Sequence, residues 1–213
     1  MEQEEGAPAF AAEPAPWHPV RLRIDDDLRR SRLTVLFRSL LAIPQVLWAL
    51  IWANAMLALY PVLWLMVLFA RKLDEDVHRF SARWLRYNTH LNAYLQLLAN
   101  PYPRFLGRPN EYPLDLEIDE PEAQKRWTVA LRLILAIPAL VFASVLGTIL
   151  FVVAVIGWFA SLALGRMPRG LRDLGAYCLR YQAQTYAYMF LLTQRYPRLG
   201  GGATGVEPPR DFS

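Results

Sequence analysis

The sequence is poor in the residues that build disulfides, metal sites and catalytic centres. It has one cysteine, Cys178, and three histidines among 213 residues. A single cysteine excludes an internal disulfide and any metal site that needs several thiolates. The histidines have no metal-ligand spacing, and the GxSxG, Walker A, HExxH and GxGxxG patterns are absent. We therefore expect a protein without a cofactor or a metal and without enzymatic activity.

Charged side chains are missing from two long stretches. Residues 39–70 and 133–165 contain no Asp, Glu, Lys, Arg or His. Uncharged apolar runs of 18 residues or more are typical of membrane-spanning segments, because a helix satisfies its own backbone hydrogen bonds in lipid. The alternative is a pair of buried helices in a globular core, but soluble helices average only about 11–12 residues. The sequence favours a membrane protein.

The chain carries a net charge of +4, and its basic residues flank the apolar runs instead of forming a separate domain. This placement points to anionic lipid head groups as partners and not to nucleic acid. A membrane protein partner is a further candidate, and the sequence gives no oligomeric state.

The chain repeats itself at an offset of 94 residues. The shared landmarks are Ile24-Asp25 with Ile118-Asp119, Leu41-Ala-Ile-Pro44 with Leu135-Ala-Ile-Pro138, Trp64 with Trp158, Leu85-Arg-Tyr87 with Leu179-Arg-Tyr181, and Tyr102-Pro-Arg104 with Tyr196-Pro-Arg198. Self-similarity at a fixed period indicates two copies of one structural unit. We expect repeat units at 18–106 and 107–199, between disordered tails at 1–17 and 200–213.

Each unit opens with a short alternating stretch, VRLRID from Val20 and LDLEID from Leu114. Alternation of apolar and polar residues is typical of a half-buried strand. If the two strands pair, their inner faces are apolar, while arginines on one outer face meet Asp115 and Glu117 on the other. The alternative is that each stretch is an extended linker on the membrane surface.

Each apolar run is too long for one membrane crossing. As a single helix, 32 residues would measure about 48 Å at 1.5 Å per residue, against a hydrocarbon core of about 30 Å. We expect each run to fold into a hairpin, turning at Asn54 and at Gly147-Thr148. An alternative is a re-entrant hairpin that enters one leaflet.

Basic residues precede and follow both runs, which places both ends of each run on the cytoplasmic side. They are Arg29, Arg30, Arg32 and Arg38, then Arg71 and Lys72, then Lys125, Arg126 and Arg132, and finally Arg166, Arg169 and Arg172. The expected topology is therefore multi-pass, with four membrane helices and both termini in the cytoplasm.

Arg38 and Arg132 lie at the start of the first span of each hairpin. A long side chain at this depth can reach back to the cytoplasmic head groups. A sharper hypothesis is that each arginine pairs with Asp25 or Asp119, or binds a lipid phosphate, since an ionisable residue inside a membrane is a candidate functional site.

After each run comes a segment with apolar and aromatic residues at helical spacing and basic residues opposite them. These segments predict amphipathic interfacial helices of about 25 residues. Their basic faces include Arg86 and Arg180, and with Arg166 and Arg169 they are candidates for head-group contact. The alternative is that the aromatic stripe only packs over its own hairpin.

The runs LRLILAIP (131–138), GWFASLALGRMPRGLRDLGAYCLRY (157–181) and AYMFLLTQRYPRL (187–199) resemble the bacterial membrane-protein family catalogued as domain of unknown function 4389, often present in duplicate. The likeness extends from His18 to Leu199. The first copy departs from it where the Gly-Arg-x-Pro-Arg-Gly segment is replaced by Arg71-Lys-Leu-Asp-Glu-Asp76. The resemblance implies a protein of the bacterial inner membrane and no assigned activity.

The expected fold is an all-α membrane protein of two tandem units, each a short strand, a transmembrane helical hairpin and an amphipathic interfacial helix. The expected function is non-enzymatic: organising lipids or a membrane protein complex through a basic cytoplasmic face. The alternative is a small transporter or channel built from two parallel repeats, for which the runs offer polar residues but no ionisable group near the midplane.

Overall fold

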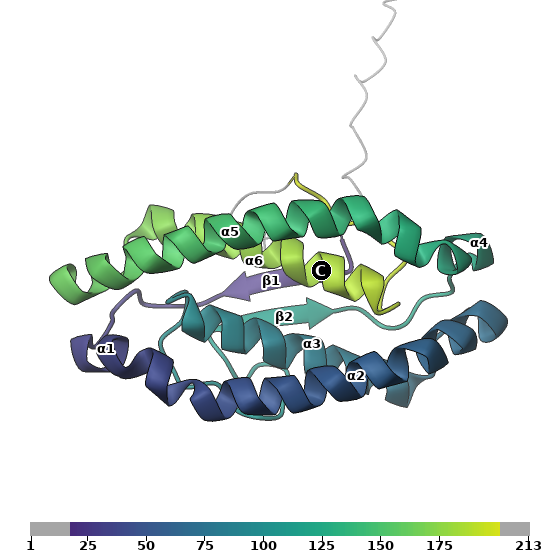
Figure 1. The fold of residues 1–213 in the computed structure, drawn as a ribbon, viewed down its shortest axis with the longest axis horizontal. Coiled ribbons are helices and arrows are strands. Elements are labelled where there is room, and N and C mark those ends of the chain that lie inside the picture. The colour runs from purple at the N-terminus through teal and green to yellow at the C-terminus, as the bar shows by residue number, and fades with distance from the viewer. Residues whose placement is uncertain (1–17, 201–213) are drawn as a thin grey trace, which may run out of the picture.

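A computed structural model describes residues 18–200 (Figure 1). The tails predicted at 1–17 and 200–213 lie, apart from Gly200, outside the described residues. In chain order the elements are β1 (Val20–Ile24), α1 (Arg32–Leu41), α2 (Ile43–Ala70), α3 (Glu75–Leu95), β2 (Leu114–Ile118), α4 (Arg126–Ala130), α5 (Arg132–Leu164) and α6 (Arg169–Met189). The described part is mostly helical, and its order of strand, short helix, long helix and third helix occurs twice.

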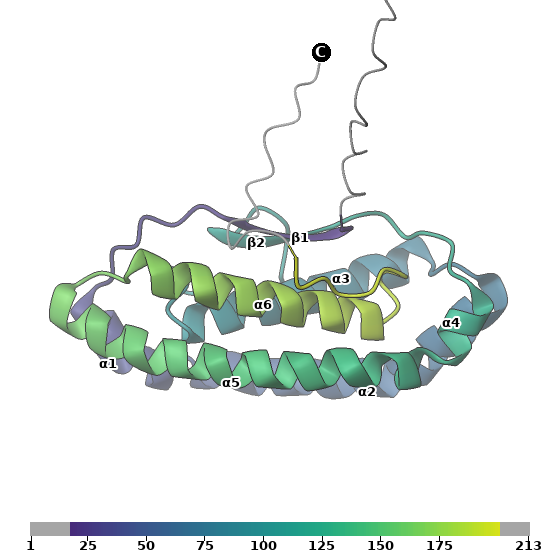
Figure 2. The same ribbon diagram turned by 90° about the horizontal axis from the view of Figure 1, so that it is seen from above.

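The elements form three layers (Figure 2). The long helices α2 and α5 run in opposite directions along one face of the molecule. Helices α3 and α6 pack on their inner side, α3 against α2 and α6 against α5. Strands β1 and β2 cover the other side of α3 and α6, over the middle of the long helices (Figure 1).

The two predicted strands pair antiparallel, with Leu22 opposite Leu116 and Arg21 opposite Glu117. Val20, Leu22, Leu114 and Leu116 are buried in the main hydrophobic core. Arg21 makes ion pairs with Glu117 at 3.3 Å and with Asp119 at 3.0 Å. The prediction of apolar inner faces and opposite charges is confirmed for these residues, and the linker alternative is excluded.

The two halves join at both ends of the molecule through equivalent tryptophans. The Trp64 indole N–H in α2 donates to the Val129 carbonyl in α4 at 2.9 Å. The Trp158 indole N–H in α5 donates to the Val35 carbonyl in α1 at 3.1 Å. The equivalent tryptophans, Trp64 and Trp158, therefore each form a hydrogen bond that links one repeat to the other.

The predicted hairpins are wrong, because α2 and α5 are continuous helices of 28 and 33 residues. The polar side chains taken for turns bond inside the helix. The Asn54 amide donates to the Leu50 carbonyl at 2.8 Å, and the Thr148 hydroxyl to the Ser144 carbonyl at 3.2 Å. A side chain satisfied by a carbonyl one turn earlier leaves the backbone ladder intact.

Gly147 has a packing role in place of the expected turn. A Cβ built on it would lie 2.8 Å from the Gln182 Nε2 atom of α6. The same Nε2 atom donates to the Ala143 carbonyl at 3.3 Å. The glycine makes room for this contact between α5 and α6.

Candidate membrane-binding surface

Helices α2 and α5 bury only one narrow stripe each. The buried residues are Gln45, Ala49, Met56, Leu63 and Val67 in α2, and Arg132, Ala136, Ala139, Ala143, Leu150, Val153, Gly157 and Ser161 in α5. They recur every three, four or seven residues, which is the spacing of one helix face. The other faces of both helices remain exposed, although almost all their residues are apolar.

The exposed faces carry large apolar side chains along their whole length. Leu57 is 68% exposed and Phe69 73% in α2, and Phe151 is 64% exposed in α5. Both helices are long and apolar enough to cross a membrane. In an apolar stretch of 18 residues within each helix, only 17% is buried in α2 and 22% in α5. A core helix of a globular protein would be mostly buried, so this low burial argues against the globular alternative.

Basic residues occur at both ends of each long helix. The exposed ones are Arg29, Arg32, Arg71, Lys72, Lys125, Arg126, Arg166 and Arg169. They border the exposed apolar face at its two narrow ends. This is the arrangement that interfacial helices use to meet lipid phosphates.

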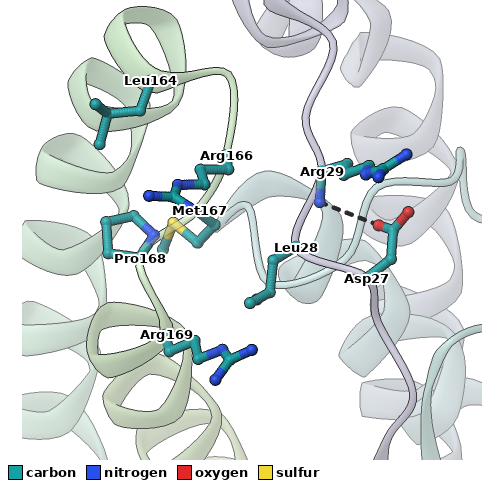
Figure 3. Close-up of a pocket in the computed structure, with 8 residues that line it drawn as sticks. All are labelled: Asp27, Leu28, Arg29, Leu164, Arg166, Met167, Pro168 and Arg169. Atoms are coloured by element: carbon teal, nitrogen blue, oxygen red, sulfur yellow. Dashed lines mark hydrogen bonds between the residues drawn. The ribbon is translucent and has the colours of Figure 1, made fainter.

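At one of these ends, Arg166 and Arg169 line a pocket of about 460 Å³ between the linker that precedes α1 and the linker that precedes α6 (Figure 3). The two linkers are joined by backbone hydrogen bonds, from Arg30 N–H to the Gly165 carbonyl and from Met167 N–H to the Leu28 carbonyl. The pocket adjoins the exposed Leu164 at the end of α5.

The arginine side chains around this pocket do not converge on one point. In Figure 3 the Arg166 and Arg169 side chains point in opposite directions, and Arg29 points to the far side of its linker, where Asp27 accepts its backbone N–H at 3.1 Å. This geometry suits several head groups of a lipid surface better than one tightly held phosphate.

Arg38 is buried and donates to main-chain carbonyls. Its guanidinium bonds to the Tyr94 carbonyl at 2.6 Å and the Ala99 carbonyl at 3.2 Å, where α3 ends. The side-chain oxygen of Asn100 accepts a further bond at 3.2 Å. The residue is 2% exposed, so the prediction that it reaches head groups is wrong.

Arg132 occupies the equivalent position in the second repeat and is fully buried. It donates to the Thr193 carbonyl at 3.0 Å, beyond the end of α6, and to the Gln124 side-chain oxygen. Carbonyls at a helix C-terminus lack partners within the helix, and a cation there also complements the helix dipole. Both arginines are therefore structural: Arg38 caps the last turn of α3, and Arg132 caps the turn that follows α6.

The proposed pairing of these arginines with Asp25 or Asp119 is also wrong. Asp119 accepts an ion pair from Arg21 across the sheet at 3.0 Å. Asp25 is exposed, and its backbone N–H donates to the Pro113 carbonyl at 2.6 Å. Both aspartates belong to the sheet layer, on the opposite side of the molecule from the exposed face of α2 and α5.

Arg86 and Arg180 are buried, so they do not form the exposed basic faces predicted for α3 and α6. Arg86 donates to the Leu116 carbonyl at 3.0 Å and approaches the Asp115 carboxylate at 3.3 Å. The Arg180 guanidinium carbon lies 5.2 Å from the centre of the Tyr177 ring. The sheet covers the faces that were expected to be open, since β2 packs on α3 and β1 on α6.

Asp115 was expected on the outer face of the sheet but is buried against α3. His90 Nε2 lies 3.0 Å from its Oδ1 atom, and the backbone N–H groups of Asn110 and Leu116 donate to its carboxylate. Burial by itself would raise the pKa of Asp115, but these hydrogen bonds outweigh it and hold the pKa below its usual value.

The sequence predicted Arg30 as a flanking basic residue, but it is buried and structural, and the structural role of Gln124 was not predicted. Arg30 donates to the Leu97 carbonyl at 2.9 Å and pairs with Asp26 at 2.6 Å. Gln124, its equivalent 94 residues later, donates to the Leu191 carbonyl at 2.6 Å. Their position in the repeat was a usable signal, but the change from arginine to glutamine hid it.

Within residues 18–200 no group of three or more His, Cys, Asp or Glu residues could hold a metal ion. The model of the family described as a domain of unknown function, DUF4389, matches residues 32–107 and again 126–199. The two matches are a tandem duplication of this domain. Searches of curated proteins and of solved structures found no match.

Proposed function

The chain belongs to the DUF4389 family, and we propose from its structure that it is a non-enzymatic protein that lies in one leaflet of the membrane and organises anionic lipids through its basic ends. The observation that carries the proposal is the position of the charged sheet. It lies over the middle of α2 and α5, on the side opposite their exposed apolar face (Figure 2).

Without the hairpins, two arrangements of the long helices remain. Each helix crosses the bilayer once, or both lie along its surface with their outer faces in the hydrocarbon. At 1.5 Å per residue, α2 and α5 measure about 42 Å and about 50 Å, which exceeds a hydrocarbon core of about 30 Å. Lying flat requires no match of length, and it keeps all four basic ends among the head groups.

The sheet favours the flat arrangement. If α2 and α5 crossed the bilayer, the Arg21–Glu117 ion pair over their middle would lie near the midplane. The Glu117 side chain is 49% exposed, so this charge would face lipid. Placing one charged residue at that depth costs about 2.5–3.5 kcal/mol or more. In the flat arrangement the same ion pair faces water at no such cost.

The basic ends define the surface that the protein would bind. The cytoplasmic leaflet is rich in anionic lipids, and each exposed Lys or Arg near it contributes about 1 kcal/mol of attraction. We therefore assign the protein to the cytoplasmic leaflet of the bacterial inner membrane. Its charged sheet remains free to contact a membrane protein partner.

The orientation is tested with single cysteines in a Cys178→Ala background, reconstituted in liposomes. Labels at Leu47, Leu57 and Phe69 should all report hydrocarbon at similar depths. A cysteine at Glu117 should react with a water-soluble maleimide. A shielded Glu117 position, together with a Leu57 label much deeper than the other two, contradicts the flat arrangement.

The role of the basic ends is tested by flotation of the purified protein with vesicles that contain phosphatidylglycerol. The double variant Arg166→Gln, Arg169→Gln should bind them more weakly, while its binding to phosphatidylcholine vesicles stays unchanged. The matched control is Arg23→Gln, which removes an exposed charge from the sheet face. If the double variant and the control lost phosphatidylglycerol binding equally, this would count against a specific role of the basic ends of the long helices.

A second candidate is the transporter alternative. The predicted parallel orientation of the repeats is wrong for this candidate, because the long helices run in opposite directions. Two repeats that crossed the membrane would have inverted orientations, as in many transporters (Figure 1). Reproducible ion or lipid flux in proteoliposomes would favour this candidate. A water-accessible Glu117 together with labels at Leu47, Leu57 and Phe69 at similar depths would exclude it.

A further inference from the structure

A second pocket, of about 450 Å³, opens between α2, α3 and the loop that follows α3. Its wall is aromatic: the Trp52 ring lies 6.2 Å from Trp48 and 6.0 Å from Phe80, centre to centre. Arg83 and Arg108 line the same pocket. It therefore has an apolar part on the membrane-facing helix and a basic part beside it.

The loop around Gly107 packs closely against the main chain of Arg83, which places Arg108, the next residue of this loop, on the same pocket. Gly107 has a φ of +55°, and a Cβ there would lie 2.2 Å from the Arg83 carbonyl oxygen. Its own carbonyl accepts a bond from Arg86 at 3.3 Å, and the Trp48 indole N–H donates to the Phe105 carbonyl at 3.1 Å. The loop is fixed before any ligand arrives, which lowers the entropic cost of binding.

Among the described residues, the side chains of these two arginines make no hydrogen bond or ion pair that would stabilise the fold. Arg83 and Arg108 are exposed, and the described residues provide no acidic side chain in an ion pair with either of them. A pair of arginines on a fixed support suits an anion such as a phosphate diester.

The pocket is specific to the first repeat. At the equivalent positions of the second repeat Trp52 is replaced by Leu146, Phe80 by Leu174 and Arg83 by Tyr177. The buried residues of α2 fall at the same repeat positions as buried residues of α5, although α5 lacks these aromatic and basic residues, so the fold itself does not require them.

We propose that this groove, defined by Trp48, Trp52, Phe80, Arg83 and Arg108, holds one anionic phospholipid. An acyl chain lies against the three aromatic rings, and the phosphate accepts hydrogen bonds from the two arginines. Ile51, 63% exposed on α2, marks the side from which the chain enters, because it belongs to the apolar face. The inference rests on the proposed membrane attachment, which brings the groove beside lipid.

The test is native mass spectrometry of the full chain in a mild detergent with added phosphatidylglycerol or phosphatidylcholine. The unaltered protein should retain one phosphatidylglycerol. Arg83→Gln with Arg108→Gln should weaken its retention about tenfold or more, since the substitutions remove the charge-assisted hydrogen bonds to the phosphate. Ala55 also lines the groove, so Ala55→Phe should abolish retention by filling it.

The matched control for the filled groove is Ile149→Phe, the equivalent position in α5. It should leave retention unchanged. Equal retention of both lipids, or retention that survives Ala55→Phe, overturns the groove. These variants should still float with phosphatidylglycerol vesicles, because the basic ends are intact. Loss of flotation by the unaltered protein would instead refute the proposed membrane attachment.

Discussion

The guanidinium carbon of Arg38 lies 4.3 Å from the centre of the Tyr94 ring. In the second repeat Arg132 stands over Tyr188 in the same way, at 4.1 Å. In each repeat the arginine lies near the start of the apolar segment, stacks over the ring and donates to carbonyls at or beyond the C-terminal end of the helix that packs on the long helix. These carbonyls are Tyr94 and Ala99 for α3 and Thr193 for α6. The pair therefore ties the start of the apolar segment to the C-terminal end of that helix.

Replacing Arg132 by alanine should destabilise the protein by about 3 kcal/mol or more. The change leaves the Thr193 carbonyl and the Gln124 side chain buried without their donor, and hydrogen bonds to a charged group contribute about 1.5–3 kcal/mol each. Thermal unfolding in detergent measures the loss. Arg169→Ala, which removes an exposed arginine, is the control and should change the midpoint little. Similar midpoints for the two variants would contradict the capping role.

Gly107→Ala should lower the free energy of unfolding by at least about 1–2 kcal/mol through the backbone alone, because a left-handed conformation is unfavourable for residues with a Cβ. The new Cβ would also collide with the main chain of Arg83 and Tyr87. Gly170→Ala is the matched control, since nothing lies within 4 Å of a Cβ there. It should stabilise α6 by about 0.5–1 kcal/mol. Denaturant unfolding of both variants checks the opposite signs.

Asp115→Asn should destabilise the protein at pH 7 and matter little in acid. The pKa of Asp115 is lowered in the folded protein, so the ionised carboxylate contributes stability above its unfolded pKa, about 3.9, and loses it as the pH falls through the folded pKa. The gap between the two proteins in unfolding free energy should narrow below about pH 4. A gap that is constant from pH 7 to pH 3 would show that the charge is not what stabilises this cluster.

The unaltered protein should lose stability as the pH falls from about 6.5 to about 4, and His18→Asn should lose less. Burial, with the nearby charges of Arg198 and Arg195, lowers the pKa of His18 from 6.5 to about 4, despite the hydrogen bond with Val20. In this pH range His18 is therefore protonated in the unfolded chain but not in the folded chain, so acid favours unfolding. Asparagine can still accept the Val20 N–H that bonds to Nδ1.

His78 also contributes to the loss of stability below about pH 6.5, because burial lowers its pKa as well. The double variant His18→Asn, His78→Asn should have the flattest dependence of unfolding midpoint on pH between 6.5 and 4. A slope unchanged from the unaltered protein would mean that other groups control it.

Local features of the fold were predictable because they depend on neighbours in the sequence. The alternation in VRLRID and LDLEID predicted the strands, and the charges of Arg21 and Glu117 predicted their pairing. The 94-residue offset predicted the duplication, which the two family matches confirm. The position of Asp115 was not predictable in this way, since its partners Arg86 and His90 come from another layer.

The sequence by itself determined that two apolar segments with basic ends need lipid or a core, since no charged residue interrupts them. Only the tertiary structure decided that each segment is one unbroken helix with a single buried stripe. It also decided that Arg38 and Arg132 turn inward. The reason is that an arginine near an apolar segment can satisfy its charge in two ways, with head groups or with free carbonyls at a helix end. That choice depends on how α3 and α6 fold back, which no local pattern encodes.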